Sequence, residues 1–410
     1  MDTQFLHAYA RILLRVGVNL QQGQNIRIAG EPIHRDFMLI LAEEAYRAGG
    51  RAVKLQYSDE RHALIRAACL DARYLDYVPG YVVPELQSYL DEDWALLHVD
   101  GAEDPDMLAG ADTSRLAAMQ RAQSAVSQFF TLQVMANKLT WCVAPMPTRK
   151  WAEKVLGPES DGRDRIEELW KILIPTLRLD RDDPVAAWSD HARMLRQRAE
   201  ALNGMDIDRL HFVGPGTDRT VGLTPRSRFI GGSATSQKGT AFMPNLPTEE
   251  VFTTPDFRRT SGKVTCTRPV EVLGVPVDGM SFEFENGAVT SFSARKGREA
   301  LEKFLGMDPH AKELGEISLV DEDSPVNRAG VVFHSILFDE NAACHMALGN
   351  GYPEAIADAG GLDEEALRAI GCNISLVHTD FMISSPQVSL VGITRSGDRR
   401  ELMRSGKLLI

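Results

Sequence analysis

Apolar positions in the first half of the chain alternate between strand-like runs and helical spacing. An apolar stripe near the amino terminus recurs every three or four residues and predicts a first helix, formed by Phe5, Tyr9, Ile12, Leu13 and Val16. Short apolar runs predict strands at residues 25–29, 52–57, 94–99 and 140–144. Helical patterns separate these runs at residues 35–48, 60–69, 84–90 and 112–137. This alternation favours an α/β domain with a mainly parallel sheet covered by helices.

Helical spacing continues over residues 163–177 and 184–202 and is interrupted at Gly204. Because the pattern changes there, we expect a domain boundary, with one domain at residues 1–204 and a second at residues 205–410. The length of 410 residues agrees with two domains, since single cores rarely grow beyond about 250–300 residues.

The second half has the texture of antiparallel strands joined by tight turns. The Asn286-Gly287 step separates the runs SFEFE and AVTSFSA and is a strong hairpin signal, because both residues tolerate positive φ. Convincing helical spacing occurs at residues 298–305 and 363–370. The second domain is therefore expected to be α+β and rich in antiparallel strands.

Composition and charge narrow the possible partners. The net charge is −12, whereas nucleic-acid-binding proteins concentrate Lys and Arg on one face, so we expect no nucleic-acid partner. No apolar run approaches the roughly 20 residues of a membrane span, so we expect no membrane partner. The five cysteines are scattered and form no CxxC pair, which suggests free thiols in a reducing compartment. We expect a soluble, cytoplasmic protein.

Several common catalytic motifs are absent from the sequence. It contains no GxGxxG and no GxxxxGK[ST], which argues against a nucleotide-binding loop, so we expect no nucleotide cofactor. It also contains no GxSxG elbow, which argues against a serine hydrolase of that type. The candidate chemistry lies instead in His and carboxylate residues of the second half.

His378 and Asp380 are separated by one residue in the apolar run NISLVHTDFMI. In a strand, residues two apart point to the same face, so the imidazole and the carboxylate are expected side by side. Buried polar groups need an opposite charge, hydrogen bonds or a metal ion. The pair alone is equally consistent with a metal site and with a structural His–Asp hydrogen bond.

Two further segments contribute carboxylates. Glu249 and Glu250 lie in NLPTEEVFTTPD, an extended segment bracketed by prolines, where successive side chains point to opposite sides and one of the two can face inward. Glu316 precedes the apolar run of ELGEISLV. Acidic residues in such positions are more often solvent-facing, so neither segment is diagnostic by itself.

Residues 338–352, FDENAACHMALGNGY, concentrate donor groups among small residues. Glu340 and His345 are five apart, which would separate them by about 140° on one regular helix, so we expect a loop that leads into a helix near Ala342. Cys344 is interpreted as a small buried residue. Because a tetrahedral zinc ion needs three or four protein ligands, the surplus of carboxylates and imidazoles suggests two ions that share a bridging carboxylate.

Four ordered motifs resemble the dinuclear metalloaminopeptidase family related to thermophilic aminopeptidase T. They are NLPTEEVFTTPD, LGEISLV, LFDENAACHMALGNGY and LVHTDFMI. Three further segments are similar to the same family: WCVAPMPTRKWAEKVL, GTDRTVGL and the Phe-Ile-Gly-Gly run at residues 229–232. The likeness extends over nearly the whole chain.

The resemblance implies a metal-ligand set at matching positions: Glu250, Glu316, Glu340, His345, His378 and Asp380. Glu316 corresponds to the bridging carboxylate, and the ions would be two divalent metals, zinc, cobalt or manganese. Tyr352 matches a family tyrosine near the metals, in position to donate a hydrogen bond to a tetrahedral oxyanion. Glu249 or Glu340 would transfer a proton to the leaving amine.

The implied reaction is removal of the amino-terminal residue from short peptides by a metal-bridged hydroxide. The substrates are expected to be short peptides with a free amino terminus. The amino-terminal domain is expected to form one wall of the cleft, and the protein to be a homodimer.

Two alternatives follow from the same residues. A mononuclear Fe(II) ring-cleaving dioxygenase of the same fold would use His345, His378 and Asp380 as a facial triad, but would not need Glu250, Glu316 and Glu340. In a catalytically silent binding protein, metal would only staple the second domain.

Overall fold

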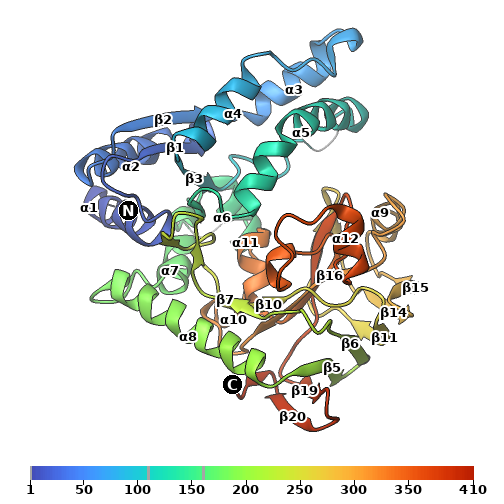
Figure 1. The fold of residues 1–410 in the computed structure, drawn as a ribbon. Coiled ribbons are helices and arrows are strands. Elements are labelled where there is room, and N and C mark those ends of the chain that lie inside the picture. The colour runs from blue at the N-terminus through green and yellow to red at the C-terminus, as the bar shows by residue number, and fades with distance from the viewer. Residues whose placement is uncertain (1, 109–110, 159–161) are drawn as a thin grey trace. The chain divides into compact units, whose positions relative to one another are not determined.

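The computed structural model describes residues 2–108, 111–158 and 162–410 (Figure 1). The chain divides into two compact units: Met1–Ser189 with Ser233–Leu246, and Asp190–Gly232 with Pro247–Ile410. Within the described ranges, no helix is both long enough and apolar enough to cross a membrane.

The first unit is built on a four-stranded parallel sheet with the order β2-β1-β3-β4. Its strands are β1 (Asn25–Gly30), β2 (Ala52–Tyr57), β3 (Ala95–Asp100) and β4 (Trp141–Pro145). Its helices are α1 (Thr3–Ile12), α2 (Arg35–Arg47), α3 (Glu60–Cys69), α4 (Val82–Asp91), α5 (Thr113–Met135), α6 (Arg149–Leu156) and α7 (Arg165–Thr176). The predicted α/β architecture with a parallel sheet is confirmed.

Most of these helices begin at an N-cap side chain that the sequence places just before the apolar stripe. The side chains of Asp2, Asp59, Asp112, Thr148 and Asp164 accept hydrogen bonds from first-turn N–H groups of α1, α3, α5, α6 and α7. Each cap satisfies a backbone donor that the helix itself cannot pair, which stabilises it by about 1 kcal/mol. Local sequence therefore determines where these helices start.

The boundary between the compact units differs from the predicted one at Gly204. Helix α8 (Pro184–Gly204) is continuous across the division, which lies between Ser189 and Asp190. Its carboxyl-terminal half packs Leu195, Ala199 and Leu202 into the core of the second unit. Conversely, Ser233–Leu246 belongs to the first unit, where Val143 of β4 forms a bridge with Asn245. Gly204 therefore marks the end of helix α8 but not the boundary between the two hydrophobic cores.

The second unit contains two antiparallel sheets. Five strands have the order β18-β17-β16-β10-β7, and eight have the order β15-β14-β11-β6-β5-β19-β20-β21. The first sheet comprises β7 (Ile230–Gly231), β10 (Glu250–Thr253), β16 (Leu314–Val320), β17 (His345–Gly349) and β18 (His378–Met382). The second comprises β5 (Ile207–Gly214), β6 (Thr217–Gly222), β11 (Thr260–Thr265), β14 (Ser281–Glu285), β15 (Ala288–Ser293), β19 (Ser389–Thr394), β20 (Arg399–Arg404) and β21 (Lys407–Leu408). The predicted antiparallel character is confirmed.

Short elements complete both units. Two-stranded pairs are formed by β8 (Ala234–Thr235) with β9 (Ala241–Phe242) and by β12 (Val270–Val272) with β13 (Val275–Val277). The helices of the second unit include α9 (Arg298–Leu305), α10 (Pro325–Arg328), α11 (Ile336–Asp339) and α12 (Glu364–Ala369). Helices α9 and α12 are the two that helical spacing predicted.

Asn286 and Gly287 form the predicted hairpin turn between β14 and β15. Their φ angles are 51° and 92°, the left-handed values that this tight turn requires. A Cβ on Gly287 would lie 2.0 Å from the carbonyl oxygen of Phe257, so this position also has no room for a side chain.

One buried core joins the two sheets of the second unit. Ile317 and Leu319 of β16, Met346 of β17 and Phe381 of β18 are fully buried in it. The ring of Phe381 packs edge-on against Phe282 of β14, with centroids 5.1 Å apart. Since side chains alternate along a strand, the other face of the five-stranded sheet is left for the residues between these apolar positions.

Candidate metal centre

Polar side chains gather on the face of the five-stranded sheet that points away from this core. In the antiparallel register, Ser318 of β16 lies opposite His345 of β17, and Ala347 of β17 lies opposite both Glu316 and Asp380. Three adjacent strands therefore present Glu316, His345 and Asp380 on one face. The alternation of apolar and polar residues in each strand produces this arrangement.

His345 connects the carboxylates of three strands. Its Nε2 atom lies 3.2 Å from Oε2 of Glu250, 4.0 Å from Oε1 of Glu316 and 4.0 Å from Oδ1 of Asp380. The imidazole is 1 % exposed. The other ring nitrogen, Nδ1, lies 3.3 Å from the carbonyl oxygen of Ala343. A buried imidazole that faces three carboxylates provides the donor atoms of a metal site.

His378 approaches the same carboxylates from β18. Its Nδ1 atom lies 2.8 Å from the carbonyl oxygen of Asn350, so Nδ1 carries the proton and Nε2 faces the cluster. Nε2 is 3.4 Å from Oε2 of Glu316 and 3.4 Å from Oδ1 of Asp380. His378 and Asp380 thus point the same way from their strand, as predicted.

The ligand atoms fall into two groups that share one residue. Glu250, Glu316 and His345 form one group, and Glu316, His378 and Asp380 form the other. Within each group the donor atoms lie within 4.8 Å of one another. Glu316 is common to both and is 4 % exposed, so its carboxylate occupies the middle of the cluster.

Burial and like charges perturb the acid–base behaviour of these residues. Burial, reinforced by the charges of Glu250 and Asp380, raises the pKa of Glu316 to about 7. Burial alone would lower the pKa of His345, but its hydrogen bond to Glu250 and the surrounding negative charge raise that pKa well above the ordinary value. Carboxylates crowded in a buried site repel one another, and a divalent cation relieves that repulsion.

Glu340 lies beside this cluster but in a different element from the one predicted. It begins a short 3₁₀ turn, η4 (Glu340–Ala342), after which the chain extends into β17. The expected helix near Ala342 is therefore wrong, because His345 to Gly349 pair with β16 and β18 instead. Burial and the charges of Glu250 and Asp380 raise the pKa of Glu340 well above its usual range, but Glu340 belongs to neither of the two candidate ligand groups.

Tyr352 is positioned against the second imidazole. Its hydroxyl lies 3.4 Å from Nε2 of His378, and the two rings meet edge to face with centroids 5.1 Å apart. Thr254 anchors the backbone of Tyr352 through two hydrogen bonds of 2.9 and 3.0 Å. Burial and the charge of Glu316 raise the pKa of Tyr352 well above its ordinary value, so the phenol is protonated and can donate a hydrogen bond.

Glu249 and Glu250 point in different directions, as the extended segment predicted. Oε2 of Glu249 lies 3.4 Å from Nε2 of His191 in α8, and both side chains are buried. The same imidazole nitrogen is 2.8 Å from the carbonyl oxygen of Thr248. Glu249 is thus held on the α8 side of the segment, while Glu250 faces His345.

Sequence reasoning missed two residues that support the ligands. The hydroxyl of Ser318 donates a 2.6 Å hydrogen bond to Oε2 of Glu250. The side chain of Asn341 accepts a 2.7 Å hydrogen bond from the N–H of Glu249. Ser318 stands two residues after Glu316, so strand alternation would have placed it on the metal face. Nothing in the spacing of Asn341 revealed its role, since its partner is 92 positions away.

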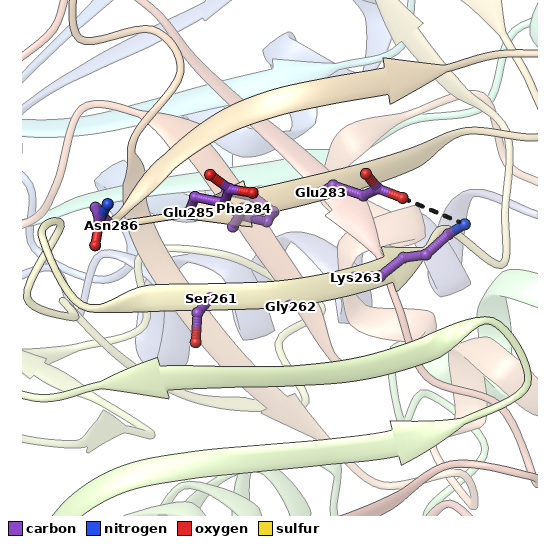
Figure 2. Close-up of a pocket in the computed structure, with 7 residues that line it drawn as sticks. All are labelled: Ser261, Gly262, Lys263, Glu283, Phe284, Glu285 and Asn286. Atoms are coloured by element: carbon purple, nitrogen blue, oxygen red, sulfur yellow. Dashed lines mark ion pairs between the residues drawn. The ribbon is translucent and has the colours of Figure 1, made fainter.

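A separate depression lies on the eight-stranded sheet, where β11 and β14 pair (Figure 2). Its lining is Ser261, Gly262, Lys263, Glu283, Phe284, Glu285 and Asn286. An exposed ion pair of 3.6 Å joins Lys263 to Glu283 across the two strands. The depression shares no residue with the carboxylate cluster, and such exposed pairs contribute only about 0–1 kcal/mol to stability.

The donor set of the cluster fits a divalent metal. Oδ1 of Asp380 is buried. Among the residues that the structure describes, no donor makes a hydrogen bond of good geometry to it, so this oxygen is available to a metal ion in the cluster. Carboxylate oxygens and imidazole nitrogens are the ligands that zinc and similar ions prefer. The cluster is therefore a candidate site for divalent metal ions.

Comparison with known proteins finds relatives that match this chain over nearly its full length. Residues 2–408 match the family described as thermophilic metalloprotease (M29). The chain is 38% identical to aminopeptidase T of Thermus aquaticus, over 100% of this chain and 99% of that protein, and 35% identical to aminopeptidase 2 of Geobacillus stearothermophilus, over 98% and 97%. The solved structure of wild-type AmpT from Thermus thermophilus superimposes with a TM-score of 0.92 at 35% identity and covers 99% of both chains.

The chain belongs to the M29 family of thermophilic metalloproteases. It is therefore a metal-dependent hydrolase that acts on peptides, and the recognition made from the four sequence motifs is confirmed. Neither the mononuclear iron dioxygenase nor the metal-stapled binding protein is supported by these comparisons.

Proposed function

We propose that this protein is an aminopeptidase that removes the amino-terminal residue from short peptides at a site with two divalent ions. The observation that carries the proposal is that Glu316 belongs to two candidate ligand groups at once, with Glu250 and His345 on one side and with His378 and Asp380 on the other. A carboxylate shared in this way suits a bridge between two ions. The similar proteins named aminopeptidases support the exopeptidase activity.

The proposed ligands comprise the two groups together with Glu340, which the motif resemblance implies. When bound, two divalent cations would supply Lewis acidity, which lowers the pKa of a water molecule and polarises the scissile carbonyl. The carbonyl oxygen of Asn350 holds His378 in the tautomer that leaves Nε2 free, and Ser318 orients the carboxylate of Glu250.

Side chains of this protein stabilise the oxyanion and transfer the proton. The protonated hydroxyl of Tyr352 donates a hydrogen bond to the oxyanion that forms at the scissile carbonyl. Glu249 or Glu340 transfers a proton to the leaving amine; Glu249 is buried beside His191 and is the one of the two that is not a proposed metal ligand. Glu249→Gln separates these roles: if Glu249 is the shuttle, kcat falls about 100-fold or more with metal content unchanged, whereas a supporting role leaves kcat within a fewfold of wild type.

A metal-dependence assay tests the activity. An amino-acyl p-nitroanilide is expected to be hydrolysed, the hydrolysis to stop after chelation, and the activity to return when zinc, cobalt or manganese is added. The same substrate with an acetylated amino group is the control and is expected to remain intact. Cleavage of the acetylated substrate, or a content of one metal ion per fully active chain, would contradict the proposal.

Further features come from the family resemblance. We infer a homodimer and a cytoplasmic location. Burial of the Cys142, Cys266, Cys344 and Cys372 thiols as free cysteines agrees with a reducing compartment. Sedimentation equilibrium of the metal-loaded protein tests the dimer, and a monomer at micromolar concentration contradicts it.

A further inference from the structure

Two of the proposed ligands come from segments that lie far apart in the chain. Glu250 begins strand β10, which is paired with β16 and β7. Glu340 begins the turn η4, which lies outside the regular strand pairing of the sheet. A metal ion needs its ligands placed to within a few tenths of an ångström, so the turn must be fixed against the strand by other contacts.

Asn341 makes such a contact. Its Oδ1 atom accepts a 2.7 Å hydrogen bond from the N–H of Glu249, the residue immediately before Glu250. Its Nδ2 atom donates a 3.0 Å hydrogen bond to the carbonyl oxygen of Leu337, and lies 3.5 Å from Oε1 of Glu340. One amide group therefore links the start of β10 to the turn that carries Glu340.

The amide is held in one orientation. Asn341 is 0 % exposed, and its backbone carbonyl accepts a 2.7 Å hydrogen bond from the hydroxyl of Ser324, which fixes the turn from a third direction. The acceptor and donor ends of the side chain have different partners, so rotating the amide would place N–H against N–H and oxygen against oxygen. Buried networks with every member satisfied are rigid, which is the property that a ligand support requires.

We propose that Asn341 is a positioning residue that sets the separation of Glu250 and Glu340 and thereby the affinity of the site for metal. It acts through the backbone of Glu249 and the side chain of Glu340, and does not itself touch metal or substrate. The inference rests on the proposed function, because it takes Glu250 and Glu340 as ligands. Outer contacts of this kind typically contribute 10- to 100-fold to metal affinity.

Two variants divide the contributions of the amide. Asn341→Asp retains an oxygen for the N–H of Glu249 but loses the donor to Leu337 and adds a negative charge beside Glu340. Asn341→Leu has a similar size and loses both hydrogen bonds. The control is Asn203→Asp, because the amide of Asn203 likewise accepts from an N–H and donates to a carbonyl, both of Phe229, at 2.8 and 2.9 Å.

The measurement is the affinity of the metal-free protein for Zn²⁺ or Co²⁺, by titration against a competing chelator. We expect both Asn341 variants to bind metal about 10- to 100-fold more weakly, with a changed Co²⁺ absorption spectrum, and excess metal to return kcat toward the wild-type value. The Asn203 variant is expected to bind as wild type does. Wild-type affinity and an unchanged cobalt spectrum in both Asn341 variants would overturn the proposal.

Two controls keep the result interpretable. If the variants do not fold, amide hydrogen exchange of wild-type protein decides, since the N–H of Glu249 must be protected in the metal-free state; rapid exchange there overturns the proposal. Wild-type protein that binds metal tightly but releases no amino acid contradicts the aminopeptidase, and leaves the comparison of metal affinities valid.

Discussion

Glu316 is the residue on which both candidate ligand groups depend. Loss of a shared carboxylate disturbs two ions, whereas loss of a terminal ligand disturbs one. We therefore expect Glu316→Gln to reduce kcat/KM more than Glu340→Gln does, by about 10-fold or more, and to lower metal content by more. Kinetics and metal analysis on the same preparations check this. Equal, mild losses with full metal occupancy in both variants would remove the bridging role.

Tyr352 differs from the ligands because its proposed contribution is confined to the transition state. Its hydroxyl lies close to His378 without belonging to either ligand group. Tyr352→Phe should lower kcat by about 100- to 1,000-fold, as loss of one oxyanion donor does, with KM and metal content nearly unchanged. A large rise in KM with kcat preserved would instead indicate that the hydroxyl binds the substrate in its ground state.

Among elements, strand β18 depends on the loop that precedes it. The carboxylate of Asp308 accepts hydrogen bonds of 2.7 Å from the hydroxyl of Ser375, 2.9 Å from the N–H of Leu376 and 2.7 Å from the N–H of His310. Partial burial opposes ionisation of Asp308, but the hydrogen bond from Ser375 and the backbone donors lower its pKa below the ordinary value. The ionised carboxylate thus fixes the loop two residues before His378.

The pH dependence of this contribution has a definite sign. Because the pKa is lower in the folded state than the unfolded value of about 3.9, the carboxylate stabilises the fold fully above that value, and the contribution is lost as pH falls through the folded pKa. Asp308→Asn should cost about 1–2 kcal/mol at pH 7 and less below pH 4. Urea unfolding of the metal-free wild type and variant, at pH 7 and below pH 4, measures the difference in their unfolding free energies. A difference that grows on acidification would refute the prediction.

The same scale shows what local sequence can and cannot predict. Alternation along β18 placed His378 and Asp380 on one face correctly, since strand periodicity is a local property. The local pattern indicated a solvent-facing Glu316, but the side chain is buried within β16, and only the motif resemblance identified it as a ligand. The helix expected near Ala342 was wrong because residues His345 to Gly349 form strand β17, which pairs with β16 and β18. Pairing with distant strands overrides the local preference of the sequence. The identities of the remaining ligands came from motif resemblance, and Asn341 came only from a contact between distant segments.

For the whole molecule, the division into two units has a measurable consequence. Every proposed metal ligand lies in the second unit, and the sheet β1 to β4 lies in the first. Ligand binding stabilises the structure that forms the site, by about 2.7 kcal/mol when free metal exceeds the dissociation constant 100-fold. Metal should therefore protect the strands that carry the ligands against unfolding more than the parallel sheet.

Hydrogen exchange followed by mass spectrometry tests this distribution. Comparing metal-loaded with chelator-treated protein, we expect slower exchange in peptides that cover β10, β16, β17 and β18, and little change in peptides that cover β1 and β3. The Glu316→Gln variant is the control, because a protein that has lost the shared carboxylate should show the smaller difference at the same metal concentration. Equal slowing in both units would mean that metal stabilises the molecule as one cooperative structure. The positions of the proposed ligands would then not explain which strands metal protects from exchange.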